Sequence, residues 1–259
     1  MGRRMIGVSA YANYEWALRK PGTPPFIILT EFPRSGGNWV RDMLGDALQL
    51  PVPRFSRWPI TFRSIIHSHD HRPTNQKTVY VVRDPRDIFV SHFHKNLTAL
   101  KVAPPKTRKR ILRIHPSLKD WANYEDVIPL MSGAYFEEWI TRPLGVRVSW
   151  REHVDNFLNC TLDTVTLVRY EDMRENPILT LSETVTSLTG HSPDQYDIEF
   201  AVKRNTFERQ TGRKTGQIDN NATKRRGEVG GWHDELPEEL AKRIFSLMSE
   251  QMIAFGYKQ

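Results

Sequence analysis

One segment near the amino terminus predicts a strand, a loop and a helix in immediate succession, and it reads Phe26-Ile27-Ile28-Leu29-Thr30-Glu31-Phe32-Pro33-Arg34-Ser35-Gly36-Gly37-Asn38-Trp39-Val40-Arg41-Asp42-Met43-Leu44. Its first part, up to Phe32, is rich in β-branched and aromatic residues, which is typical of a strand buried on both faces. Pro33 ends the strand, and apolar residues recur at helical spacing from about Asn38. The loop between them can point backbone N–H groups at an anion, next to the positive end of the helix. A purely structural turn would give the same pattern, and the Lys of a Walker A loop is missing.

The rest of the chain alternates strands with helices. Further buried strands are expected at residues 78–83 and 164–170, and amphipathic helices at 177–189 and 237–255. Asp84 and Pro85 form a helix start, with Asp as N-cap and Pro at the first helical position. Such alternation predicts an α/β fold, a single domain with a central parallel β-sheet flanked by helices. We expect this domain to span residues 26–259, after an N-terminal extension and linker at residues 1–25.

Composition limits the classes of function. The net charge is +7 and the pI about 9.5. This excess suits solubility, an anionic ligand or nucleic acid, in that order. The basic run Lys106 to Arg110 is most simply a solvated helix face. No apolar run is long enough to span a membrane, and one cysteine excludes an internal disulfide. We therefore expect a cytoplasmic protein in a reducing compartment.

Two further clusters carry candidate chemistry. Arg83 stands at the carboxyl end of a strand, where open α/β sheets bind ligands, although an ion pair with Asp84 or Asp87 is the alternative. Three histidines, His67, His69 and His71, alternate along an extended segment and so share one side. A zinc site is the competing interpretation, but no partner cluster with metal-ligand spacing occurs elsewhere in the sequence.

Four motifs in order resemble those of the sulfotransferases that use 3′-phosphoadenosine 5′-phosphosulfate (PAPS), especially the cytosolic type and its bacterial relatives. Residues 32–39 resemble the family's 5′-phosphosulfate loop, Tyr-Pro-Lys-Ser-Gly-Thr-Thr-Trp, which is P-loop-like. Residues 82–91 resemble its 3′-phosphate element, and residues 170–177 its Tyr-Glu-Asp segment. Residues 225–232 resemble its C-terminal Arg-Lys-Gly-x-x-Gly-Asp-Trp loop. The resemblance runs from about Phe26 to Tyr257.

The resemblance implies a role for each matching residue. The 5′-phosphosulfate would be cradled by Arg34, Ser35, Gly36, Gly37 and Asn38. The 3′-phosphate, retained in the product 3′-phosphoadenosine 5′-phosphate (PAP), would be bound by Arg83, Ser91, Arg225, Arg226 and Gly227. Adenine would be surrounded by Trp39, Tyr170, Phe207 and Thr206. His69 falls where the family has its catalytic base, and Glu31 or His67 would be tested next if His69 were not the base.

The chemistry of sulfuryl transfer agrees with these roles. Negative charge builds on the leaving phosphate oxygen, so cations and N–H donors stabilise the transition state without a metal. A base near neutral pKa favours His. Arg34 replaces the family's Lys, so it can stabilise charge but cannot donate a proton. Gly37 replaces a Thr, and the family's short dimerisation pattern after Trp232 is absent, so the oligomeric state stays open.

The expected function is therefore a sulfotransferase that moves a sulfuryl group from PAPS to a hydroxyl or amine of a small-molecule or glycan acceptor. The alternative is a non-catalytic nucleotide-binding or nucleic-acid-binding α/β module. Nucleic acid is disfavoured because no base-stacking aromatic residues are interleaved with the basic run at residues 106–113. A P-loop kinase is disfavoured by the missing Walker residues.

Overall fold

The computed structural model describes residues 15, 26–53, 60, 62–70, 72–123, 128–143, 145–219, 222 and 224–259. The extension and linker expected at residues 1–25 lie outside the described residues except for Glu15, and so does His71. Within the described part the chain forms two compact units. The first comprises Met1–Val82 and Asn156–Gln210, and the second comprises Arg83–Asp155 and Thr211–Gln259. The single domain expected over residues 26–259 stays a prediction.

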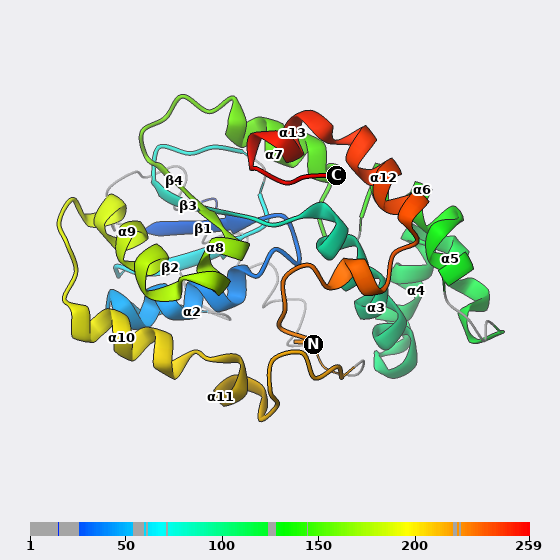
Figure 1. The fold of residues 1–259 in the computed structure, drawn as a ribbon, viewed down its shortest axis with the longest axis horizontal. Helices are drawn as coiled ribbons and strands as arrows, with labels where there is room; N and C mark the ends of the chain where they lie inside the picture. Colours follow the sequence, from blue (N-terminus) through cyan, green and yellow to red (C-terminus); the bar gives the residue numbers. More distant parts are fainter. Residues whose placement is uncertain are drawn as a thin grey trace. The chain divides into compact units, whose positions relative to one another are not determined.

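The first unit contains a sheet of four parallel strands in the order β2-β1-β3-β4 (Figure 1). The strands are β1 (Ile27–Glu31), β2 (Ile65–Ser68), β3 (Lys77–Val82) and β4 (Val165–Arg169). The predicted parallel α/β sheet is thus confirmed. The prediction that the last strand is buried was wrong, because β4 lies at the edge of the sheet and Leu167 is 50% exposed.

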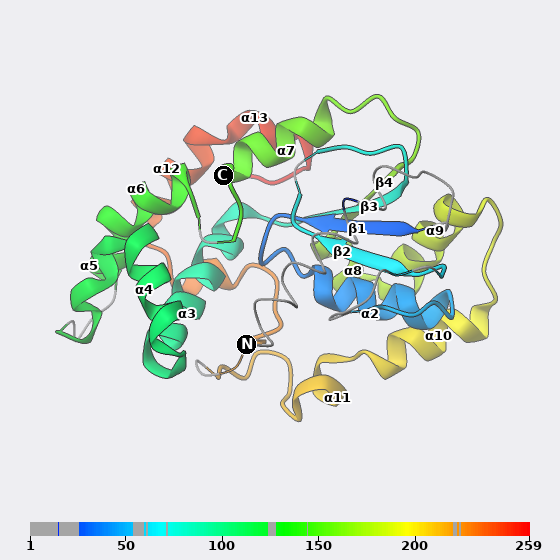
Figure 2. The same cartoon turned by 180° about the vertical axis from the view of Figure 1, so that it is seen from behind.

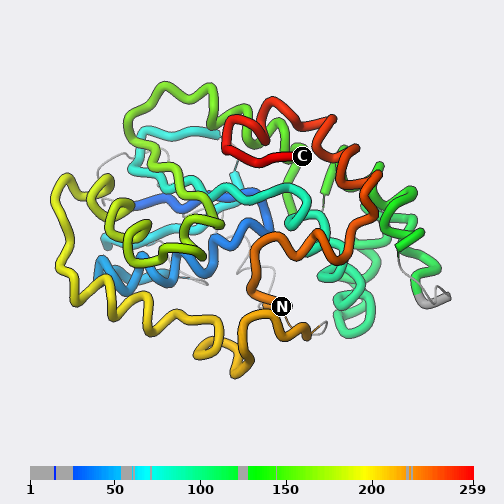
Figure 3. The backbone as a smooth tube through the Cα atoms, viewed as in Figure 1, coloured from blue at the N-terminus to red at the C-terminus, as the bar shows by residue number. Residues whose placement is uncertain are grey.

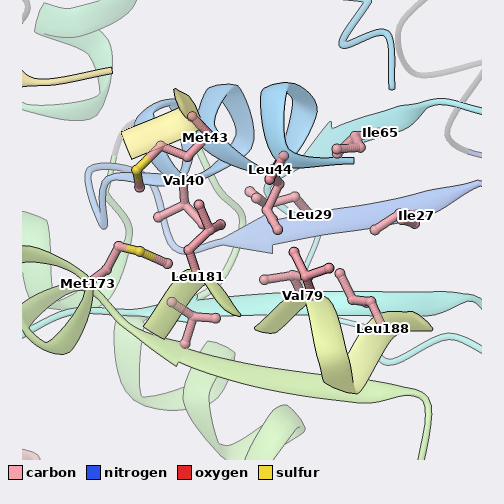
Figure 4. Packing of buried hydrophobic residues seen from close by; sticks show 14 of the residues in the cluster. Ile27, Leu29, Val40, Met43, Leu44, Ile65, Val79, Met173, Leu181 and Leu188 are labelled. Carbon is pink, nitrogen blue, oxygen red and sulfur yellow. The ribbon is translucent and has the colours of Figure 1, made fainter. Parts of the chain in front are cut away.

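Helices of the first unit cover one face of this sheet. They are α2 (Gly37–Ala47), α8 (Tyr170–Glu175), α9 (Pro177–Thr189) and α10 (Gln195–Arg204). The short α11 (Phe207–Thr211) follows α10 in the chain. Figure 2 shows α2 beside β2 and α10 beyond α2. The buried side chains of α2 and α9 meet those of β1 and β3 in one apolar core (Figure 4), which includes Leu29, Leu44, Val79 and Leu181.

The opposite face of the sheet has its own apolar groups. Ile28 and Ile66 belong to a second buried cluster, and Tyr80 stacks on Phe157 with the ring centroids 3.8 Å apart. Phe157 comes from α7 (Trp150–Leu158). Side chains that alternate along β1 are therefore buried on both faces, as its β-branched and aromatic sequence predicted.

The regular elements described in the second unit are all helical, and Figure 3 traces them through its green and its orange to red stretches. They are α3 (Pro85–Val102), α4 (Pro105–Ile114), η1 (Pro116–Asn123), α5 (Ile128–Ser132), α6 (Ala134–Thr141), η2 (Gly231–Asp234), α12 (Glu238–Leu247) and α13 (Ser249–Ala254). The side chain of Asp84 accepts a hydrogen bond from the Arg86 N–H, and Pro85 is the first helical residue of α3. The predicted start of α3 is confirmed.

Two predictions about helices need correction. The helix expected at residues 237–255 is broken at Met248, whose φ of −131° interrupts it. Its amphipathic character is also incomplete, because the apolar side chains of Leu247 and Ile253 are 43% and 62% exposed. No helix in the described ranges is both long and apolar enough to cross a membrane.

Candidate active site

The loop between β1 and α2 has the backbone geometry of an anion cradle. Arg34 has φ 83° and Gly36 φ 94°, so both residues are left-handed. This conformation is costly for a side-chain-bearing residue such as Arg34. The backbone N–H groups of Trp39 and Val40 already bond to the Gly36 carbonyl, which starts the helix. The Ser35 hydroxyl is fully buried and has no hydrogen-bond partner among the residues that the structure describes. It is therefore a polar group that a bound anion would satisfy.

Glu31, the last residue of β1, joins this loop to the histidine segment. Its side chain is 3% exposed. Its Oε2 atom accepts a hydrogen bond from the Gly37 N–H at 2.5 Å, and its Oε1 atom lies 3.2 Å from His67 Nε2. The contacts follow from the parallel register, because Leu29 pairs with His67 and alternation then puts Glu31 on the same side of the sheet. Leu29 faces α2 in the core, so this is the side of the sheet that α2 covers.

The hydrogen bonds of the two histidines fix different tautomers. Arg41 Nη1 lies 3.4 Å from His67 Nδ1, and a guanidinium only donates, so Nδ1 accepts and Nε2–H donates to Glu31. His69 Nδ1 lies 3.2 Å from the backbone oxygen of Glu31, which only accepts. His69 therefore carries its proton on Nδ1 and its lone pair on Nε2. Its side chain is 41% exposed, against 14% for His67, so His69 is the more accessible base.

The charges of this cluster compensate one another. Burial alone would raise the pKa of Glu31, but the hydrogen bond and charge of His67, the charge of His69 and the Gly37 N–H together hold the pKa below its usual value. Arg41 is nearly buried and pairs with Asp42 at 2.8 Å. One potential ligand atom from each of Glu31, His67 and His69 lies within 4.8 Å of the others. The adjacent guanidinium and the N–H on the carboxylate fit an ionised acid held by protein donors better than a metal centre.

The residues expected around adenine also lie in the first unit. Trp39 and Tyr170 meet edge to face with their centroids 5.8 Å apart, and Arg174 lies over the Trp39 ring. The Trp39 indole donates to the carbonyl of Asn205 at 2.7 Å, which brings Trp39 to the segment that continues into Thr206 and Phe207. Phe207 is buried, whereas Thr206 is exposed and its hydroxyl accepts from the Arg209 N–H. The first unit therefore gathers the loop, His69 and these aromatic residues.

The residues expected at the 3′-phosphate lie in the second unit, where Asp87 contacts one of them, Arg83, and the backbone of the C-terminal loop. Arg83 donates to Asp87 at 3.2 Å and to the Glu228 carbonyl at 3.1 Å. Asp87 also accepts from the backbone N–H groups of Gly230 and Trp232. The ion pair with Asp87 that the sequence allowed for Arg83 is thus present. It uses one nitrogen of a guanidinium that carries five N–H donors.

The C-terminal loop is cross-linked by further ion pairs. Arg225 pairs with Glu235, and Arg226 pairs with Glu228 and with Asp234. Gly227 has φ 70°, a left-handed conformation that favours glycine. In the segment before this loop, the backbone N–H groups of Gly216 and Asp219 donate hydrogen bonds to the carbonyls of Arg226 and Arg225. Ser91 lies about two turns into α3 and is half-buried.

Sequence reasoning missed two organising side chains. Glu31 was only an alternative base, although it is the single charged residue in the apolar strand segment and that was the available signal. Asp87 was only a possible partner of Arg83. Its contacts with the backbone of residues 230 and 232 connect parts far apart in the sequence, and no local pattern encodes them.

Comparison with known proteins places the chain in a family. A family model described as the sulfotransferase domain matches residues 62–256. The chain belongs to the sulfotransferase domain family. It is 23% identical over 280 residues to cytosolic sulfotransferase 13 of Arabidopsis thaliana, covering 90% of this chain and 78% of that protein. It is 24% identical over 267 residues to sulfotransferase 2A1 of Mus musculus, covering 88% and 85%.

Solved structures agree with the fold. Mouse sulfotransferase SULT7A1 complexed with PAP superposes with a TM-score of 0.66 at 17% identity, covering 95% of this chain and 91% of that one. Retinol dehydratase in complex with androsterone and the inactive cofactor PAP gives a TM-score of 0.62 at 16% identity, covering 97% and 87%. The expected α/β fold is confirmed, and this sulfotransferase is an enzyme of a PAPS-dependent transferase family. That membership sets aside the non-catalytic and kinase alternatives.

Proposed function

We propose that this sulfotransferase transfers a sulfuryl group from PAPS to a hydroxyl or amine of a small-molecule or glycan acceptor, with His69 as general base. One observation carries the proposal. Glu31 holds His69 through its backbone carbonyl and holds the Gly37 N–H of the loop through its carboxylate. The expected base and the expected 5′-phosphosulfate loop are therefore both within reach of one residue.

The loop supplies groups that suit a phosphosulfate. The buried Ser35 hydroxyl and the amino-terminal end of α2 would bind its oxygens, and Arg34 would stabilise the charge that develops on the leaving oxygen. The left-handed backbone of Arg34 is a local strain of the kind that clusters at functional sites. The remaining residues of the cradle would be Gly36, Gly37 and Asn38, with Trp39, Tyr170, Thr206 and Phe207 at adenine.

The reaction balances with protein groups alone. The acceptor oxygen or nitrogen attacks sulfur, its proton moves to Nε2 of His69, and the bond between sulfur and the phosphate oxygen breaks. The bonding electrons leave with that oxygen, which gives PAP. Arg83, Ser91, Arg225, Arg226 and Gly227 would bind the 3′-phosphate, since guanidinium groups bind phosphate oxygens bidentately.

The setting of the reaction is also part of this proposal. Retinol dehydratase was solved with androsterone and with retinol, which are small molecules, so a small-molecule hydroxyl is the first acceptor class to test. The name of cytosolic sulfotransferase 13 supports a cytosolic location. We propose no metal in the mechanism.

The test is transfer of labelled sulfate from PAPS across panels of phenols, steroids, amines and sugars, with wild type and His69→Ala. We expect His69→Ala to lower turnover by roughly 10²–10⁴-fold, the range for a positioned acid–base group. Its affinity for PAP, measured by calorimetry, should stay near that of wild type. Retained turnover in a natively folded His69→Ala variant would show that the base lies elsewhere.

A further inference from the structure

We propose that Glu31 and His67 form a positioning pair for His69, which orients its imidazole and stabilises the imidazolium that it forms during transfer. The proposal rests on the function proposed above, in which His69 is the base. It adds two residues that do not touch the reacting atoms. Each acts through a contact that the structure gives.

The first contact sets the orientation of His69. Its Nδ1 lies 3.2 Å from the Glu31 backbone oxygen, which fixes the proton on Nδ1 and the lone pair on Nε2. The ring also packs edge to face on His67, with the centroids 4.9 Å apart. The segment that carries His69 is anchored by the hydroxyl of Thr30, which donates to the carbonyl of Asp70 at 2.7 Å. His69 is thereby held at the end of β2 in one tautomer.

The second contact is electrostatic. Oε1 of Glu31 lies 3.9 Å from His69 Nδ1, close enough for an ionised carboxylate to favour the charged imidazole. The carboxylate cannot turn away readily, because its other oxygen bonds to the Gly37 N–H and Oε1 also faces His67. A buried acid that orients a histidine and stabilises its imidazolium is an established catalytic arrangement.

His67 holds the carboxylate of Glu31 in place by a hydrogen bond and does not act as a second base. Its Nδ1 faces Arg41, whose guanidinium is fixed by Asp42 at 2.8 Å and 3.1 Å. Its Nε2–H faces the carboxylate of Glu31. Because Nδ1 accepts from Arg41, the ring of His67 is oriented with its Nε2–H toward the carboxylate of Glu31.

The other charged groups around His69 are balanced and lie on the neighbouring elements. Asp70 follows it in the chain and is bonded by Arg72, which also reaches Glu15. On β3, burial raises the pKa of Tyr80 well above its usual value, with a further rise from the charge of Glu31, so Tyr80 stays neutral. Among the residues that the structure describes, Glu31 is the acid whose carboxylate faces the Nδ1 edge of His69.

Gly37 makes the arrangement possible. A Cβ at this position would lie 2.5 Å from Glu31 Cδ and 2.8 Å from its Oε1, distances that real Cβ atoms do not show. The Thr of the family motif at this position would therefore displace the carboxylate of Glu31. The glycine at residue 37 therefore provides the space that the buried carboxylate of Glu31 occupies.

The direct test is the imidazole pKa of His69, measured by NMR titration of the whole chain, with the resonance assigned by its loss in His69→Ala. Glu31→Gln keeps the shape of the side chain and removes its charge. We expect it to lower the His69 pKa by about one unit, the low end of the range for a neighbouring opposite charge because His69 is partly exposed. Glu138→Gln is the matched control, since Glu138 likewise accepts a hydrogen bond from a backbone N–H, that of Ser117, and lies 3.6 Å from a histidine, His115. It should leave the His69 pKa unchanged.

Three further variants keep the test decisive if Glu31→Gln folds poorly. Gly37→Ala should displace the carboxylate and lower the His69 pKa in the same direction. His67→Leu should do so too, whereas His67→Gln, which retains an N–H donor toward Glu31, should restore the wild-type value. An unchanged His69 pKa in Glu31→Gln, or in both Gly37→Ala and His67→Leu, would overturn the proposal.

Turnover separates this inference from the proposed function. If both are right, the acid limb of the pH profile for turnover shifts down by about one unit in Glu31→Gln, and the plateau falls about tenfold. Loss of turnover in His69→Ala with an unshifted Glu31→Gln profile would refute the positioning pair and leave the proposed base intact. Retained turnover in His69→Ala with loss in Glu31→Gln would instead make Glu31 the base and refute both.

Discussion

Replacement of Gly36 by alanine tests how tightly the loop between β1 and α2 is built. Gly36 has φ 94°, and a Cβ there would lie 2.4 Å from Cδ2 of the Tyr170 ring. The left-handed backbone should cost about 1–2 kcal/mol for a residue with a side chain. Forcing a methyl group against a packed ring should add about 1–3 kcal/mol. We therefore expect Gly36→Ala to lower the free energy of unfolding by about 2–5 kcal/mol.

The chain offers a matched control for the backbone part of this cost. Gly190, which ends α9, has φ 84° and nothing within 4 Å of the position of a Cβ. Gly190→Ala should therefore cost only about 1–2 kcal/mol. Equilibrium urea unfolding of both variants gives the difference, which is the contribution of the Tyr170 contact. Two-state behaviour must be checked with two probes, because the chain forms two compact units.

A double-mutant cycle isolates the same contact. In a Tyr170→Ala background the methyl group of Gly36→Ala has no ring to meet, so its cost should fall to that of Gly190→Ala. Equal costs of Gly36→Ala in both backgrounds would refute the close approach of Tyr170 to the loop. Residue 36 would then require glycine only because of its left-handed backbone and not because of the Tyr170 ring.

Three other outcomes are expected. Burial lowers the pKa of His115 to about 4, whereas its pKa in the unfolded chain is about 6.5, so protonation favours the unfolded state as the pH falls from 6.5 toward 4. Over that range the wild type should lose about 3 kcal/mol of unfolding free energy relative to His115→Gln. Identical pH dependence of the two unfolding free energies would contradict this. Arg83→Ala or Arg226→Ala should weaken PAP binding by about 2–3 kcal/mol but barely change binding of adenosine 5′-phosphosulfate, and equal losses for both ligands would refute their assignment to the 3′-phosphate. Strong chelators should not change turnover; loss of activity restored by zinc would revive the metal interpretation of the histidine segment.

Sequence patterns predicted the parts of the fold that local chemistry encodes. The strand at residues 78–83, the capped start of α3 and the helix from Pro177 to Thr189 all appear as expected, with Gly190 left-handed at the end of that helix. Each has a local cause: a β-branched run, an Asp-Pro cap, or a glycine that the left-handed C-cap favours. Such signals act within a few residues and survive in any tertiary setting.

The failures lie where neighbours in space override the local pattern. α10 has Ile198 and Ala201 buried, but Tyr196 and Phe200 exposed on its other side, which hides its amphipathic period. β4 reads like β3 in sequence, yet its place at the edge of the sheet leaves Leu167 half-exposed. No glycine or proline lies at the break at Met248, so the sequence does not predict it. Position in the sheet and packing between helices are properties of the whole chain, so one strand's sequence cannot contain them.

The candidate site also combines a locally encoded loop with contacts that only the tertiary structure provides. Glu31 makes the second kind of contact, and its neighbours compensate its negative charge. A buried carboxylate beside a loop proposed to bind a phosphosulfate would repel that anion if it were uncompensated. Here the Gly37 N–H, His67 and the nearby Arg41 surround it with donors and positive charge. In the proposed reaction a proton reaches His69 as negative charge builds on the leaving phosphate oxygen. The carboxylate of Glu31 then faces a charged imidazolium, while the loop faces a more negative phosphate. The buried carboxylate therefore destabilises the protein before transfer and stabilises the charges that form during transfer. The register of β1 on β2 and the glycine at residue 37 together place it there.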